Sequence, residues 1–311
     1  MLNLVILSFS LFSTPNYFKN YYPYISQAEI CIMQQQYDKA MQYYKKGFQK
    51  VKYQNIPYKD CHNYTICAFL QNDTLEGFRY LEKLVSMGST PHLLSQHPVF
   101  GLYLNTSHWQ KLTQKTDSLL QIHQKIFRQE DYQYLDSLSY QNMHSTCMNP
   151  KAQKDTPDHM DRFREFIKEK GFLNDYEIKK GLSPRPDYNL LKFNYSFEWI
   201  NLLKEAAKKG KISPYVYAKQ YDFFYHSLDH LDIQRMPPNI IRKNTYYASF
   251  IIEPDHFFSF VTEGNGNLMS STNTKNINKN RKALGIITFK EAQKMVVFKK
   301  ENAKNLQFLL Y

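Results

Sequence analysis

Apolar side chains recur every three or four positions through residues 23–88, a spacing typical of amphipathic helices. Polar turns at 34–36 and 71–73 interrupt this spacing. The pattern therefore predicts two helix pairs, one around each turn.

The two pairs repeat each other at a distance of 37 residues. The matched positions are Ala40 with Gly77, Tyr44 with Leu81, and Gly47 with Leu84. Small residues at matched positions let two helices approach closely, and larger residues on the same face complete the contact. Helical hairpins that stack on one another are the expected result.

This stretch resembles the tetratricopeptide-repeat family, over about 65 residues and two units. The residues that carry the resemblance are Tyr37, Ala40, Tyr44 and Gly47 in the second helix, with Tyr24, Gln27 and Ala28 where the family has Trp, Leu and Gly. The resemblance implies an α-α superhelical domain over residues 20–142, whose concave face holds an extended peptide or a partner protein. Two units are too few to bury a continuous core, so residues 95–142 are expected to cap them.

A third hydrophobic layer and a long helix are predicted within this cap. The layer is assigned to Val99, Phe100, Leu102, Leu104, Trp109 and Leu112. The helix is predicted from Gln114 through Tyr140.

The helical periodicity stops at residues 143–156, which we interpret as a linker before a second domain at 157–311. Thr156, Pro157 and Asp158 then form a helix-start signal. Further helices are expected to end near Gly171, to begin at Ser196 and end at Gly210, and to begin again at Ser213. The second domain thus starts as a helical bundle.

The pattern changes after residue 245. Aromatic and β-branched runs at 246–252 and 256–261 predict a small hairpin or two edge strands, which makes this domain α-rich with a small β element. The segment from Gly264 to Asn280 is predicted to be a turn followed by a polar loop. Residues 289–300 fit either a helix or a strand.

The second domain resembles a domain-of-unknown-function family associated with secreted bacterial proteins, over about residues 157–286. The resemblance is carried by Gly210–Pro214, Ala218, Asp222, Tyr247–Phe250, Asn278, Arg281 and Leu284–Ile286. It implies no known activity.

This chain departs from that family at three polar positions. Phe223 stands where the family has Arg, Phe250 where it has Gln, and the stretch 190–194 lacks the usual His. A catalytic site built from those positions would be lost here, so the departures lower the expectation of an enzyme.

The N-terminal residues 1–19 form a candidate signal peptide. Their apolar run has the length of a signal-peptide core and is far shorter than the roughly 20 residues of a membrane span, although no Lys or Arg precedes it. With cleavage, the chain is expected to be periplasmic or secreted, without a transmembrane segment. The alternative is a buried N-terminal segment in a cytoplasmic protein.

Composition and charge narrow the function classes. The 311 residues include 25 Tyr and 22 Phe, enough apolar surface for packed cores, and carry a net charge of +12. Residues 271–311 alone hold nine basic and two acidic residues, a positive charge that would attract anionic envelope surfaces. No nucleic-acid-binding motif occurs, and no nucleic-acid partner is expected. Cys31, Cys61, Cys67 and Cys147 are interpreted as small buried hydrophobic residues.

The main candidate for chemistry lies in the second domain. Asp222, His226 and His230 recur every four residues on one predicted helix, so their side chains share a face. Since the helix lacks the glutamate of the H-E-x-x-H motif, we expect no metal there, and no cofactor elsewhere; His226 and His230 are the candidate ligands. His256, beside Asp255, is a weaker candidate for acid–base work.

Two functions follow. The favoured one is a non-enzymatic protein-binding or scaffolding protein of the bacterial cell envelope, whose helical-repeat surface holds a protein or peptide through exposed tyrosines such as Tyr43 and Tyr58. The alternative is a metal-dependent hydrolase-type enzyme that uses Asp222, His226, His230 and Arg281.

Overall fold

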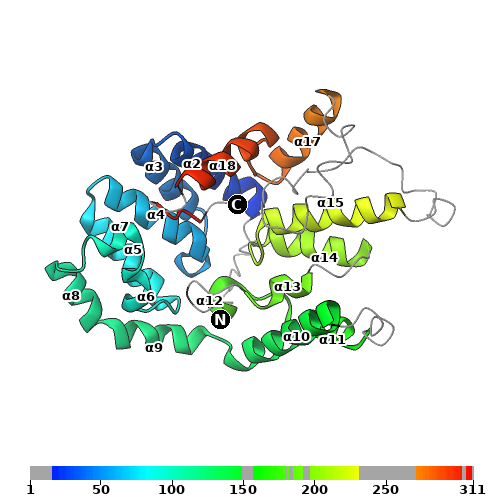
Figure 1. Cartoon of the computed structure of the whole chain (residues 1–311), viewed down its shortest axis with the longest axis horizontal. Helices are drawn as coiled ribbons and strands as arrows, with labels where there is room; N and C mark the ends of the chain where they lie inside the picture. The colour runs from blue at the N-terminus through cyan, green and yellow to red at the C-terminus, as the bar shows by residue number, and fades with distance from the viewer. Residues whose placement is uncertain are drawn as a thin grey trace, which may run out of the picture.

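Figure 1 shows the computed structural model of the chain. The structure describes residues 16–148, 157–179, 181, 185–191, 197–230, 271–302 and 306–309. These residues are mainly α-helical, and they contain no strand.

The first part of the chain forms short helices that pack in pairs. Their bounds are α1 Tyr17–Asn20, α2 Tyr22–Met33, α3 Tyr37–Phe48, the 3₁₀ turn η1 Tyr53–Asn55, α4 Tyr58–Leu70 and α5 Thr74–Ser86. Helix α2 packs against α3, α4 against α5, and α3 against α4, so the pairs also contact each other. The predicted packed helix pairs are confirmed.

The two turns inside the pairs have the same geometry, 37 residues apart. Gln35 and Asn72 both adopt the left-handed conformation, with φ of 57° and 58°. One residue later, the N–H of Gln36 donates to Cys31 at 2.8 Å and that of Asp73 to Ala68 at 2.9 Å. The repeat seen in the sequence is therefore a repeat of backbone structure as well.

Gly77 lies where α5 crosses α4. A Cβ at this position would come within 2.7 Å of the Phe69 ring, well inside van der Waals contact. The close approach of the two helices thus requires a small residue at position 77, which is matched to Ala40 in the first pair.

The cap predicted after the second pair consists of four short helices. They are α6 Pro91–Ser95, α7 Pro98–Gly101, α8 Ser107–Gln114 and α9 Thr116–Ile126. Four of the six residues assigned to the hydrophobic layer are buried, but Leu102 and Leu104 are 80% and 40% exposed. The single helix predicted from 114 to 140 is in fact two helices, because the extended backbone of Phe127 ends α9.

Helices α10–α15 follow. Their bounds are α10 Gln129–Met148, α11 Pro157–Lys170, α12 Asp175–Ile178, α13 Asp187–Leu191, α14 Phe197–Lys208 and α15 Pro214–His230. Gly171 and Gly210 have φ of 70° and 72° just after α11 and α14, as predicted for helix ends. Helix α10 continues to Met148, so it enters the range 143–156 that was predicted as a linker.

The last two helices correct the loop prediction. Helix α17 spans Ser271–Ala283, although this segment is polar, and α18 spans Phe289–Asn302, the segment left open between helix and strand. Tertiary contacts support α17, because Ile277 and Arg281 are buried and Arg281 Nε donates to the carbonyl of Ile287.

The end of the chain packs on its beginning. Helix α18 contacts α2, so the red and blue parts of the ribbon lie side by side in Figure 1. Helix α1 in addition contacts α14. One buried cluster includes residues from both predicted domains. The division into two domains stays a prediction. Residues 149–156 of the predicted linker 143–156 lie outside the described residues.

Four residues of the candidate signal peptide belong to the folded structure. Asn16 caps α1, and Tyr17 and Phe18 are 2% and 7% exposed. A leader would have to end before Asn16 to leave this helix intact.

Several predictions fall outside the described residues. These are the apolar run at 1–15, the β element at 246–262 and the cluster around His256. Of the helices in the described ranges, none has the length and hydrophobicity needed to cross a membrane.

The Gly77 contact gives a first prediction. Gly77→Val should lower the free energy of unfolding by about 2 kcal/mol, because the new side chain has no room beside Phe69. Leu75→Ala, on the same helix but 74% exposed, should change it by less than about 0.5 kcal/mol. Urea denaturation followed by circular dichroism measures both; equal effects would contradict the close contact.

Candidate functional site

The two tyrosines expected to bind a partner differ in how far they are exposed. Tyr43 on α3 is partly buried, and Lys46 Nζ lies 5.3 Å from the centre of its ring. Tyr58 is fully buried at the start of α4, with its hydroxyl 2.7 Å from Ser89 Oγ. Tyr58 is therefore not at the surface, because residues far along the chain cover the first turn of α4.

Two of the four residues of the enzyme alternative lie together. Asp222 on α15 and Arg281 on α17 are both fully buried. Burial lowers the pKa of Arg281, while Tyr215 and Asp222 act in the opposite direction. These two of the four candidate residues therefore interact electrostatically.

The candidate metal ligands cannot be assigned to that pair. His226 and His230 belong to α15, but their side chains are not among those that the structure describes. Within the described part of the chain, no group of three or more His, Cys, Asp or Glu is placed to hold a metal ion. The hydrolase hypothesis therefore stays untested.

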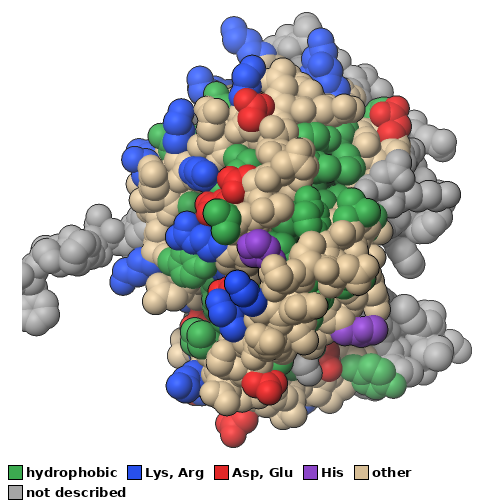
Figure 2. All heavy atoms as spheres, turned by 90° about the vertical axis from the view of Figure 1, so that its left-hand side faces the viewer, with side chains coloured by type: hydrophobic (Ala, Val, Ile, Leu, Met, Phe, Trp, Pro, Cys, Tyr) green, Lys and Arg blue, Asp and Glu red, His purple; other side chains and the backbone are tan. Residues whose placement is uncertain are grey.

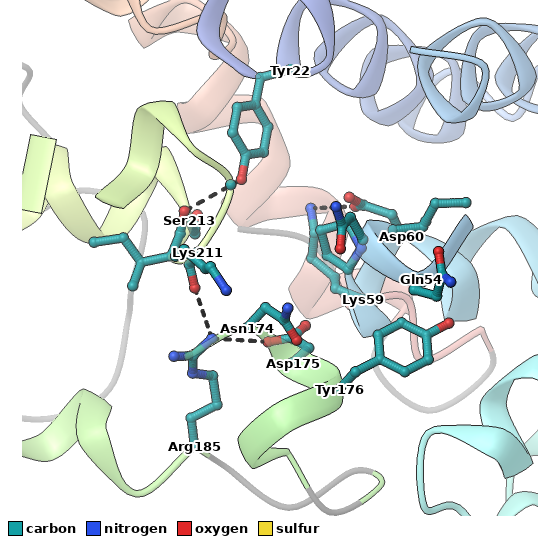
Figure 3. Close-up of a pocket in the computed structure, with 15 residues that line it drawn as sticks. Tyr22, Gln54, Lys59, Asp60, Asn174, Asp175, Tyr176, Arg185, Lys211 and Ser213 are labelled. Atoms are coloured by element: carbon teal, nitrogen blue, oxygen red, sulfur yellow. Dashed lines mark hydrogen bonds and ion pairs between the residues drawn. The ribbon is translucent and has the colours of Figure 1, made fainter. Parts of the chain in front are cut away.

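A small polar pocket lies where the first helices meet the middle of the chain (Figure 3). Tyr22 reaches into it from α2, Lys59 and Asp60 come from α4, Asp175 from α12, and Lys211 from the turn between α14 and α15. The pocket has a volume of about 20 Å³, enough for a single water molecule. It is too small for a substrate.

Charged side chains around the pocket pair with one another. Lys59 forms ion pairs with Glu29 and, at 3.2 Å, with Asp60. Burial alone would lower the pKa of Lys59, but the two carboxylates raise it above its usual value. Asp60 also accepts a hydrogen bond from the Tyr21 hydroxyl at 2.8 Å, which ties α2 to α4.

Arg185 is the centre of a second buried set. Its guanidinium donates to both carboxylate oxygens of Asp187, at 2.7 and 3.1 Å, and to Asp175 at 3.2 Å. It also donates to the carbonyls of Leu173 and Lys211. The other Asp175 oxygen accepts from the backbone N–H of Tyr58 at 2.9 Å, so this network joins the start of α4 to the second half of the chain.

A larger hollow of about 430 Å³ lies between α11 and α14. It is lined by Asp161, Arg164, Glu165, Lys168, Glu198, Trp199 and Leu202. Acidic and basic side chains alternate around it, so no single charge is favoured in a ligand. The charged groups of the smaller pocket are paired with one another, so neither hollow by itself assigns a reaction.

Asn63 on α4 makes the contact best suited to binding another segment of polypeptide. Asn63 is fully buried, and its side-chain amide holds the backbone of Leu309, 246 residues away. Nδ2 donates to the Leu309 carbonyl at 2.8 Å, and the Leu309 N–H donates to Oδ1 at 2.8 Å. Residues 306–309, which we call the tail segment, have no regular secondary structure here.

Aromatic rings complete this contact. Phe308 stacks on Tyr37 at the start of α3, with 6.0 Å between ring centres, and lies 6.4 Å from Phe298 of α18. Backbone groups of Leu306 and Gln307 lie close to His97 and favour its protonated form. We call the residues Tyr37, Asn63, His97 and Phe298 the tail site.

Neither Asn63 nor the tail segment was predicted from the sequence. The apolar end of the chain, with Leu306, Phe308 and Leu309, was a usable signal, since three large apolar residues close to a basic helix need a place to pack. No pattern linked that end to one buried asparagine on the second helix pair.

The face toward the left of Figure 1 carries basic, hydrophobic and uncharged polar side chains. Figure 2 shows Lys and Arg side chains gathered along its margins, with a strip of hydrophobic side chains among polar ones. On α17 and α18, the exposed lysines are Lys275, Lys279, Lys282, Lys290 and Lys294. The basic end of the sequence therefore forms solvent-exposed helix faces.

Comparison with protein-family models, with curated proteins and with solved structures gave no match. No family is identified by these comparisons. The two resemblances proposed from the sequence rest on the residues that carry them.

The Arg185 network gives a second prediction. Arg185→Ala should lower the free energy of unfolding by about 3–5 kcal/mol, because Asp187 stays buried without this partner. Arg164→Ala, which removes the exposed pair with Asp161, should cost less than about 1 kcal/mol. Urea unfolding at pH 7 compares the two variants, and similar losses would show that the Arg185 network is not the stronger tie.

A third prediction concerns acid stability. Burial and the neighbouring His97 lower the pKa of His62 to about 3, and burial lowers that of His97 to about 4. An unfolded histidine takes up a proton near pH 6.5, so falling pH favours the unfolded chain below that value and has no such effect above it. His62→Phe should therefore retain about 2 kcal/mol more of its neutral-pH stability at pH 5 than the unmodified chain.

The control for this measurement is His92→Gln, since His92 is exposed and its ring lies 3.4 Å from the side-chain nitrogen of Gln96. Urea unfolding of the three proteins at pH 7.5, 6 and 5 gives the comparison. An identical loss of stability in all three would contradict a buried neutral His62.

Proposed function

We propose that this chain is a non-enzymatic protein-binding protein of the bacterial cell envelope, whose helix pairs α2–α5 hold an extended segment of a partner protein. The pairs would act as tetratricopeptide-like repeats, with the tail site as the place where the segment binds. The single observation that carries the proposal is the way in which Asn63 holds the backbone of a non-helical segment of the chain.

Asn63 recognises the backbone. An amide side chain that donates to one carbonyl and accepts from one N–H of the same residue satisfies both main-chain groups of any residue except proline. Main-chain hydrogen bonds of this kind give affinity, while neighbouring side-chain contacts select the sequence. Tyr37 and Phe298 supply an aromatic contact next to the bound residue.

The helix pairs provide a rigid base for this contact. Asn63 lies between buried residues on a helix that packs against both α3 and α5. A side chain held in this way loses little additional freedom when it binds, which favours affinity. The matched turn geometry of the two pairs supports the assignment as stacked repeats.

The envelope location rests on the sequence. The apolar N-terminal run supports export, and the exposed lysines of α17 and α18 would favour contact with anionic envelope surfaces. A protein or peptide partner is the main ligand in this proposal.

Site-specific cross-linking tests the proposal in the full chain. A photoreactive amino acid replaces Tyr37, whose ring contacts the tail segment, or Ser118, which is exposed on α9. Irradiation in envelope fractions should give a discrete protein adduct from position 37, with the cross-link confined to one segment of the partner in mass spectrometry. The same adduct should form with the purified partner.

Position 118 should give no such adduct. Equal adducts at both positions, or none at position 37, would contradict the proposal. Turnover of a hydrolase substrate that is lost in Asp222→Asn would instead support the enzyme alternative.

A further inference from the structure

The tail segment has the features of a bound ligand. It is distant in sequence from everything it contacts at the tail site except α18, and it lies against α4 without adding to any helix. Leu306, Phe308 and Leu309 are only partly buried, and Gln307 is exposed. A segment that is only partly buried can open locally without unfolding the rest of the protein.

The backbone of the tail segment is strained. Gln307 adopts φ of 44°, in the left-handed region that residues with a side chain rarely occupy. Such a conformation persists only where surrounding contacts impose it, here the Asn63 bonds on one side and the Phe308 stack on the other. The strain weakens the binding of the tail and favours its exchange for another segment.

We propose that the tail segment is an intramolecular ligand that occupies the tail site until a partner's segment displaces it. The partner segment carries an aromatic residue followed by an aliphatic one, as Phe308 and Leu309 do, and has a free N–H at the second position. The inference rests on the proposed function, because it assigns the regulation and the ligand chemistry of that same site.

Tethering sets the strength of this competition. A segment attached through a short connection has an effective concentration of about millimolar at its own site. An outside segment of equal intrinsic affinity therefore binds poorly to the intact chain, and it binds much better when the tail is released. The tail raises the affinity that a true partner must have.

Proline at position 309 releases the tail by a minimal change. Leu309→Pro removes the N–H that donates to Asn63 Oδ1 and leaves the rest of the full chain unchanged. Because the tail opens locally, this variant should unfold in urea at nearly the same midpoint as the unmodified chain. A large loss of stability would show that the rest of the fold depends on this segment, and would overturn the proposal.

The binding probe is a fluorescent peptide with the sequence of residues 304–311, measured by anisotropy. It should bind the Leu309→Pro chain at least about tenfold more tightly than the unmodified chain. A matched peptide with proline at position 309, or with alanine at position 308, should bind the released chain at least about tenfold more weakly. Equal affinity for both chains, or no binding to the released chain, would overturn the proposal.

This result is independent of the cross-linking test. A partner adduct from position 37 without peptide binding would reject the tail as ligand and keep the protein-binding function. Peptide binding without any adduct would support the internal ligand and reject an envelope partner at this site.

Discussion

A charged side chain withdrawn from water needs opposite charges and hydrogen-bond partners around it, and Arg185 meets this need with groups from separate parts of the chain. Asp187 lies beside it, Asp175 belongs to α12, and the Lys211 carbonyl follows α14. Asp175 in turn accepts from the first N–H of α4. The helix pairs are thereby fixed to the middle of the chain, and the position of α4 determines where Asn63 lies.

The helix pairs were predictable because their signal is local. Residues within one turn of a helix decide its apolar face, and the small residue at Gly77 reports a close contact with a helix that comes just before it. Helix α17 was missed for the opposite reason. Its residues 271–283 include few strong helix formers, and the helix is supported by contacts of Arg281 and Asn278 with residues 287 and 289.

The candidate site was less predictable than the fold. Tyr58 was expected at the surface, yet Asp175 and Ser89, which are distant in sequence, cover it. Asn63 and Leu309 are even farther apart in the sequence, and their pairing produces no periodic pattern of apolar and polar residues. Periodicity identifies which face of a helix is apolar, but it does not identify which remote segment will cover that face.

The packing of α18 on α2 also has a consequence during synthesis. Helix α2 leaves the ribosome roughly ten seconds to a minute before α18, at an elongation rate of about 5–20 residues per second. During that interval the side of α2 that α18 contacts lacks this helix, although α3 and α4 have already been made. A chaperone or another polypeptide met in this period would reach that surface before the C-terminal helix arrives.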